Sequence, residues 1–113
     1  MPTVTYRHYG DRIDYTPAAA VEAGDVIVLN TDERIGIATA DIAANALGSL
    51  AVEGVFNFPK SDGSSTALVQ GDLVFWDVAD QEINTDSANP MAGIVAKAAS
   101  DDDTTVDVKL HLY

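Results

Sequence analysis

Apolar and polar residues alternate along two segments of the chain. In the segment Thr105–Tyr113 the apolar residues share one parity: Val106, Val108, Leu110 and Leu112. The segment 50–58 repeats this pattern with Leu50, Val52, Phe56 and Phe58. Because successive side chains of a β-strand point to opposite faces, a period of two predicts a half-buried strand in each segment. We expect the C-terminal strand to be central to the fold.

Two other segments are continuously apolar. The runs Val26–Leu29 and Leu73–Trp76 are short, rich in β-branched and aromatic residues, and preceded by Gly-Asp. Runs of this kind are typical of strands that are covered on both faces, so we expect both to be central strands, with Trp76 in the core. The alanine-rich segments 18–23 and 40–47 each stop at a glycine and predict at most one or two helical turns.

Turn-forming residues separate these segments at short intervals. They occur at Gly10-Asp11, Asn30-Thr31-Asp32, 59–65, 86–90 and 100–103. Closely spaced strands favour an all-β fold, which we expect to be a small barrel or sandwich of about eight to nine short strands with little helix.

The chain also shows an internal repeat of short motifs. Gly24-Asp25, Gly36-Ile37 and a strand at Leu50 are followed, in the same order, by Gly71-Asp72, Gly93-Ile94 and a strand at Val106. The second copy would carry about ten extra residues in a hairpin around 81–89. Duplication and chance matching of Gly-Asp turns are the two alternative explanations of this repeat. We expect a single domain over 1–113, with an N-terminal hairpin or arm at 1–16, a first β-unit at 21–60 and a second at 68–113.

Composition narrows the functional classes. The 113 residues include 18 acidic and 6 basic side chains, a net charge of −12, and no cysteine. Disulfides, thiolate metal sites and cysteine nucleophiles are therefore excluded. The acidic balance argues against nucleic-acid binding, which depends on lysine and arginine contacts to phosphates. No apolar run approaches the ~20 residues that span a bilayer, so we expect no membrane partner.

Catalytic motifs are absent from the sequence. No Gly-x-Ser-x-Gly, phosphate-binding loop, Gly-x-Gly-x-x-Gly or His-Glu-x-x-His occurs. His8 and His111 lie on segments that we expect to be solvated. The acidic residues at 101–103 and between Asp77 and Asp86 are interpreted as a hairpin turn and an exposed strand edge, with calcium binding as the alternative. We expect no enzyme activity and no cofactor.

The N-terminal segment is the strongest candidate for a protein contact. It combines aromatic and cationic side chains in a chain that is poor in both: Tyr6, Arg7, His8, Tyr9, Arg12 and Tyr15. Aromatic and arginine side chains are enriched at interfaces. An ordinary edge hairpin is the alternative interpretation.

The order of motifs resembles the capsid-cement, or head-decoration, proteins of tailed bacteriophages, which in prophages are often known only as a domain of unknown function. The resemblance spans nearly the whole chain. Its motifs are Gly10-Asp11 with Ile13-Asp14-Tyr15-Thr16, Ala23-Gly24-Asp25, Gly36-Ile37-Ala38 with Asp41-Ile42-Ala43, Leu50 to Phe56 with Pro59-Lys60, Gln70-Gly71-Asp72, Val74, Trp76-Asp77, Gly93-Ile94 with Ala96, and Val106, Val108 and Leu110.

This resemblance implies a small β-barrel or tulip-like fold that forms homotrimers on the outer capsid surface. It implies a non-catalytic structural virion protein, present in the host cytoplasm during assembly, whose partner is the major capsid protein. The N-terminal residues would then contact the capsid or a neighbouring protomer. The alternative function is a receptor- or carbohydrate-binding β-module of a virion or cell surface, which a shallow aromatic pocket would favour.

Overall fold

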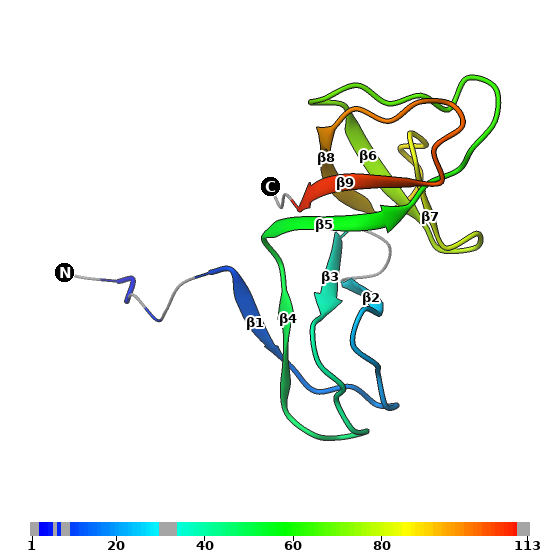
Figure 1. Cartoon of the computed structure of the whole chain (residues 1–113). Helices are drawn as coiled ribbons and strands as arrows, with labels where there is room; N and C mark the ends of the chain where they lie inside the picture. The colour runs from blue at the N-terminus through cyan, green and yellow to red at the C-terminus, as the bar shows by residue number, and fades with distance from the viewer. Residues whose placement is uncertain (1–2, 6, 8–9, 30–33, 111–113) are drawn as a thin grey trace.

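The computed structural model describes residues 3–5, 7, 10–29 and 34–110, and these form nine β-strands and no helix (Figure 1). The strands are β1 (Arg12–Tyr15), β2 (Val26–Leu29), β3 (Arg34–Ala38), β4 (Gly48–Ala51), β5 (Gly54–Pro59), β6 (Leu73–Asp77), β7 (Glu82–Asn84), β8 (Met91–Lys97) and β9 (Thr105–Leu110). The predicted all-β fold is confirmed. The alanine-rich segments form bends, turns and isolated bridges.

The first four strands form an antiparallel sheet in the order β1-β4-β3-β2. Arg12 of β1 lies opposite Ala51 of β4, and Ala51 lies opposite Ile37 of β3. Ile37 in turn lies opposite Val26 of β2. Among the described strands, β1 pairs with β4 alone and β2 with β3 alone, so both are edge strands of this first sheet.

The remaining strands form a second antiparallel sheet in the order β5-β9-β8-β6-β7. A parallel bridge between Lys60, directly after β5, and Ile83 of β7 brings the two ends of this sheet together. The backbone N–H of Ser61 donates to the Ile83 carbonyl at 3.3 Å. The second sheet therefore curls into a small barrel, as predicted.

The two sheets are parts of one hydrogen-bonded nine-stranded sheet, and they meet at a corner and at a parallel bridge. At the bridge, Arg34 of β3 lies opposite Met91 of β8. At the corner, the predicted strand 50–58 is divided into β4 and β5, with Gly54 at a φ of +118°. Glycine adopts this left-handed region without a Cβ clash, so the chain leaves the first sheet here and joins β9. Figure 1 shows the first sheet on one side of the corner and the barrel on the other.

The two continuous apolar runs differ from the prediction. Val26–Leu29 forms the edge strand β2, in which all four residues are half-buried, so it is neither central nor covered on both faces. Leu73–Trp76 does pair on both sides, with β7 and β8. Only one of its faces is covered: Val74 and Trp76 are buried, whereas Leu73 is 39% exposed. An apolar run shows that a strand has two apolar faces but does not show what packs against them.

The C-terminal strand agrees with the prediction as far as it is described. β9 lies between β5 and β8, and Val106, Val108 and Leu110 point into the core while Asp107 and Lys109 do not. At the N-terminus, the described residues 3–5 and 7 belong to no strand and β1 pairs with β4, and the N-terminal hairpin or arm at 1–16 stays a prediction. Tyr6, His8, Tyr9, His111, Leu112 and Tyr113 lie outside the described residues.

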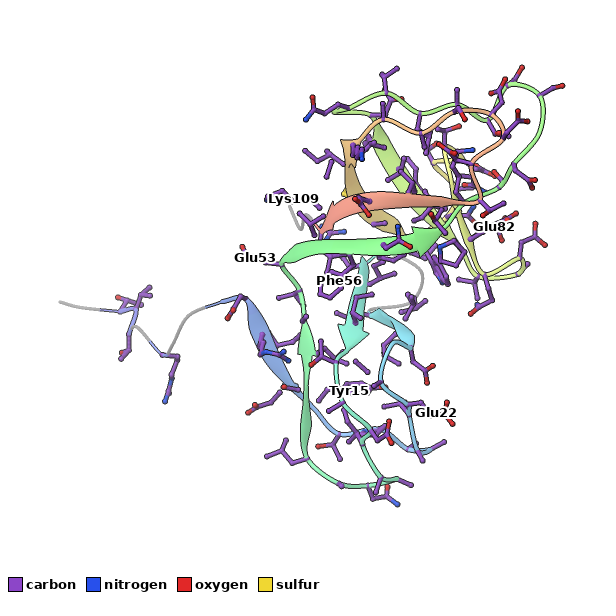
Figure 2. The ribbon with its side chains drawn as sticks, viewed as in Figure 1. Tyr15, Glu22, Glu53, Phe56, Glu82 and Lys109 are labelled. Carbon is purple, nitrogen blue, oxygen red and sulfur yellow. The ribbon has the colours of Figure 1, made fainter. Side chains whose placement is uncertain are left out.

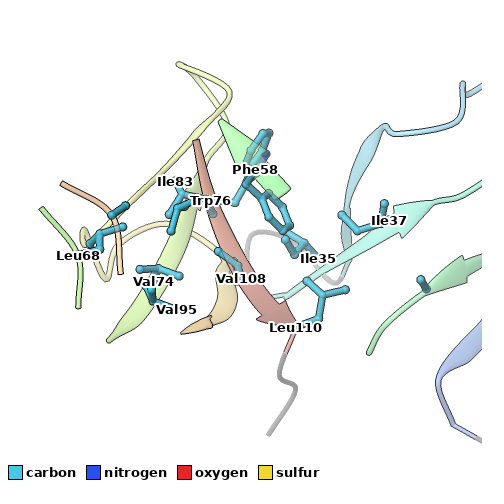
Figure 3. Close-up of a cluster of buried hydrophobic side chains, with 14 residues drawn as sticks. Ile35, Ile37, Phe58, Leu68, Val74, Trp76, Ile83, Val95, Val108 and Leu110 are labelled. Carbon is cyan, nitrogen blue, oxygen red and sulfur yellow. The ribbon is translucent and has the colours of Figure 1, made fainter. Parts of the chain in front are cut away.

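The main core fills the barrel and its junction with the first sheet (Figure 3). Phe58 and Trp76 pack with ring centroids 5.9 Å apart and planes tilted by 60°. Ile35 and Ile37 of β3 belong to the same cluster, so the first sheet covers one side of the barrel core. The buried cluster is Ile35, Ile37, Ala51, Phe58, Leu68, Val74, Trp76, Ile83, Ala92, Val95, Ala99, Val106, Val108 and Leu110.

The internal sequence repeat corresponds to a repeated turn in the structure. Gly24 and Gly71 both have a φ of +94°. In the first copy, Asp25 accepts a hydrogen bond from the Glu22 N–H at 2.9 Å through its carboxylate, and from the Ala38 N–H at 3.0 Å through its carbonyl. In the second copy, Asp72 makes the same two bonds, with the Val69 and Val95 N–H groups, both at 2.9 Å.

The repeat extends to the strand order. β1-β4-β3-β2 of the first sheet corresponds to β5-β9-β8-β6 of the second, and β7 is the addition, in the hairpin where the sequence indicated extra residues. The bridges Val21–Ile42 and Leu68–Ala99 also correspond. By pairing, the two units separate at 52–53, and β1 belongs to the first as β5 belongs to the second.

Candidate interaction surfaces

The structure separates the described members of the N-terminal candidate segment. Arg7 is exposed and belongs to no strand, while Arg12 and Tyr15 lie on β1. Arg12 and Tyr15 differ in parity, so they point to opposite faces of the sheet. The Arg12 guanidinium donates through Nη1 to Thr39 Oγ1 at 2.8 Å and Ser49 Oγ at 3.3 Å. Arg12 therefore also joins β1 to its own sheet, a role that sequence reasoning missed.

A cleft of about 300 Å³ lies between the two sheets. Its walls come from the Gly24-Asp25 turn and Val26 on one side and from β5 and Gln81 on the other; the lining residues are Gly24, Asp25, Val26, Ile37, Phe56, Asn57, Phe58, Pro59, Trp76 and Gln81. Phe58 and Trp76 are only 2% and 3% exposed, and Phe56 is half-buried. Sugar recognition by stacking needs an open ring face, which these two buried rings do not offer.

The outer face of the second sheet carries a row of side chains across four strands. Val55 of β5 lies opposite Lys109 of β9, Lys109 opposite Ile94 of β8, and Ile94 opposite Leu73 of β6. Val55 is 57% and Leu73 39% exposed. We call Val55, Lys109, Ile94 and Leu73 the outer row. By register, Lys109 and Phe56, both labelled in Figure 2, lie on opposite faces of the β5–β9 pair. Phe56 packs against the core, so the outer row faces away from it.

The sequence did not indicate the exposure of the outer row, for two reasons. Val55 lies on the polar parity of the segment 50–58, where an apolar residue is the exception that could have indicated an exposed contact. Leu73 and Ile94 lie in segments that are apolar on both parities, so their exposure depends on what packs against each face.

The acidic segments hold turns together. Asp77 Oδ1 accepts hydrogen bonds from the N–H groups of Ala79 and Asp80 at 3.0 and 3.1 Å. Asp101 Oδ1 accepts from the N–H groups of Thr66 and Ala67 at 3.0 and 2.7 Å. Carboxylates commonly stabilise turns in this way. Over the described ranges, no three side chains of the metal-ligating types gather into a possible ion site.

Lys60 is the one buried charged residue of the described chain, at 3% exposure. Its Nζ donates to the Ser61 carbonyl at 2.7 Å, to Thr66 Oγ1 at 3.2 Å and to the Asp103 carbonyl at 3.3 Å. A buried ammonium needs such acceptors to offset its desolvation. These contacts join the loops that follow β5 and β8 at the point where the barrel closes, a role that the sequence did not indicate.

These features define a small all-β domain that presents surfaces, and comparison with known proteins gives its family. The family model described as phage cement protein matches residues 8–110. The chain belongs to this family, and its membership identifies it as a structural protein of the phage virion that associates with capsid proteins. The resemblance recognised in the sequence is thereby confirmed.

The comparisons with curated proteins and with solved structures gave no match. The described part of the chain contains no helix that is long and apolar enough to cross a membrane.

Proposed function

We propose that this protein binds the outer surface of the phage capsid and stabilises contacts between neighbouring major capsid protein subunits. The observation that carries the proposal is the match to the phage cement family over residues 8–110. The curled barrel supports it, because a domain that holds two partners together must resist deformation itself. The protein acts without catalysis, reaches its partner in the host cytoplasm during assembly and then resides on the virion.

We further propose that the protein acts as a homotrimer. An icosahedral lattice offers local three-fold positions, and a closed ring satisfies all of its own interfaces. Several contacts made at once by one trimer give avidity even where each contact is weak. The net charge of −12 supports selectivity, since it disfavours association with other acidic surfaces and with nucleic acid.

The N-terminal segment supplies the capsid contact in this proposal, through Tyr6, Arg7, His8, Tyr9, Arg12 and Tyr15. Support comes from its composition and from the exposure of its described cations, Arg7 and Arg12. Cations that meet an acidic partner would speed association and set its register.

Co-sedimentation with capsids that lack this protein tests the proposal. The expected result is saturable binding at a fixed ratio to the major capsid protein and a higher temperature of capsid disruption. A panel of glycans serves as the comparison, since the carbohydrate-binding alternative predicts retention on sugars. Binding to glycans without binding to capsids would contradict the proposed function.

A further inference from the structure

We infer that the outer row of the second sheet is the surface by which one copy of this protein binds the next, against the acidic β6–β7 hairpin of that copy. The inference rests on the proposed assembly into homotrimers. It starts from the register of the strands, which places Val55, Lys109, Ile94 and Leu73 side by side on one face. Val69, in the turn that leads into β6, adds a further side chain that is 61% exposed.

The repeat within the chain supplies the first argument. The row of the first sheet that corresponds to the outer row consists of Arg12, Ala51, Ile37 and Val26. Ala51 and Ile37 belong to the core cluster and Val26 packs against it. This face of the repeated unit is therefore covered in the first sheet by another part of the same chain. In the second sheet the corresponding face keeps apolar side chains but has no such cover within the described residues.

Charge complementarity supplies the second argument and identifies the occupant. Lys109 lies within the outer row, and Lys97 lies on the same face, at the other end of β8. Two of the chain's six cations thus belong to one face, on which Asp107, the register partner of Lys97, is the acidic residue of β9. Lys109 is the cation that lies within the apolar outer row. The complementary surface is available on the chain itself, in the hairpin that contains Asp77, Asp80, Glu82 and Asp86.

The acidic residues of the hairpin are different residues from those of the outer row, so a contact between the two sets is heterologous. Heterologous contacts close into rings when the rotation per subunit allows it, and three subunits suffice. Asp77 and Asp86 cap their own turns, and no hydrogen bond in the described structure engages the carboxylates of Asp80 and Glu82. Of these two, Asp80 is exposed and Glu82 is half-buried. Asp80 is therefore the partner we assign to Lys109.

Sedimentation of the free protein, without capsids, tests this inference. We expect Val55→Lys and Lys109→Glu each to raise the concentration needed for self-association at least tenfold, with melting temperatures unchanged because both side chains are exposed. Leu47→Lys is the matched control, since it places the same charge at an apolar residue that is 71% exposed elsewhere. Adding Asp80→Lys to Lys109→Glu should restore a large part of the association.

Three outcomes would overturn the inference. The first is a Val55→Lys variant that self-associates as strongly as the wild type. The second is a wild-type protein that stays monomeric at high micromolar concentration. The third is a Lys109→Glu, Asp80→Lys double variant that self-associates no more strongly than Lys109→Glu alone. Capsid co-sedimentation of the same variants separates the two proposals. Normal capsid binding by a protein that does not self-associate would reject this surface and leave the proposed capsid function standing, whereas self-association without capsid binding would do the reverse.

Discussion

The two sheets of this protein share one strand order but differ in how their edges end. In the second sheet, the β6–β7 hairpin and the Lys60–Ile83 bridge bring the edges together. The first sheet has no counterpart of β7 within the described residues, and β1 and β2 remain edge strands. An unpaired edge leaves backbone N–H and C=O groups without partners from the sheet. The presence of the β6–β7 hairpin thus explains why the second sheet curls into a barrel while the first sheet stays open.

The difference also determines where the core lies. Most members of the buried cluster come from the barrel, and the first sheet contributes Ile35, Ile37 and Ala51 to it. The first sheet is therefore stabilised by packing on the barrel, whereas the barrel encloses its own core. We expect the barrel to be the more stable half, and the following predictions test that expectation, from the largest effect to the smallest.

Aspartate at buried sites should affect the two halves unequally. Val108 of β9 and Leu50 of β4 are both fully buried and occupy corresponding positions in the two sheets. An unpaired charge at Val108 should cost several kcal/mol, a large part of the ~5–15 kcal/mol that stabilises a small domain, and should unfold the whole chain. Val108→Asp should therefore give no cooperative melting transition.

Leu50→Asp is the matched variant in the first sheet. We expect hydrogen exchange to show lost protection over β1–β4 while β6, β8 and β9 stay protected, because the barrel core is largely its own. Equal loss of protection in both halves would show that the two sheets unfold as one unit.

Removing the Lys60 ammonium should loosen the closure of the barrel. Lys60→Met keeps most of the aliphatic chain but leaves two carbonyls and a hydroxyl without their donor, at a cost of about 1–3 kcal/mol. Denaturant unfolding measures the loss. Lys109→Met, at an exposed lysine of the neighbouring strand, is the control and should leave the free energy of unfolding nearly unchanged. An equal effect of both substitutions would argue against the role of Lys60 in closure.

Alanine at the two repeated glycines should show how strongly each turn is coupled to folding. Both glycines have a φ of +94°, and a Cβ at either position would meet no atom within 4 Å. The cost is therefore conformational, about 1–2 kcal/mol at each site. We expect Gly71→Ala to lower the free energy of global unfolding by this whole amount. Gly24→Ala should lower it by less, because the Gly24 turn leads into the edge strand β2. A larger effect of Gly24→Ala would reverse the proposed order of stability.

Charge reversal of the N-terminal cations should have the smallest effect on folding. Arg7→Glu should leave the melting temperature unchanged, and Arg12→Glu should lower it by about a degree or two, through loss of the Thr39 and Ser49 contacts. Together they should weaken capsid co-sedimentation at least tenfold, equivalent to about 1.4 kcal/mol. Normal capsid binding by the double variant would move the contact surface elsewhere, with the 81–89 hairpin as the next candidate.

The amino-acid sequence by itself determined the all-β class, the buried parity of β9, the repeated Gly-Asp turn and the position of the extra hairpin. These features are local: alternation with a period of two follows from the geometry of a single strand, and the turn needs only a glycine with positive φ and the aspartate beside it. The order of these motifs along the chain also sufficed for the family resemblance, which the match over residues 8–110 confirmed.

The tertiary structure alone decided which apolar runs are edges, where the strand 50–58 breaks, how Lys60 closes the barrel and which face of each repeat is covered. Ile37 and Ile94 are each the second residue of a Gly-Ile dipeptide, and they occupy corresponding positions in the two sheets. Ile37 nevertheless lies in the core, whereas Ile94 faces outward. Their local sequences cannot distinguish them, because exposure depends on whether a distant segment packs against that face. That contact joins residues far apart in the chain, and only the folded arrangement brings them together.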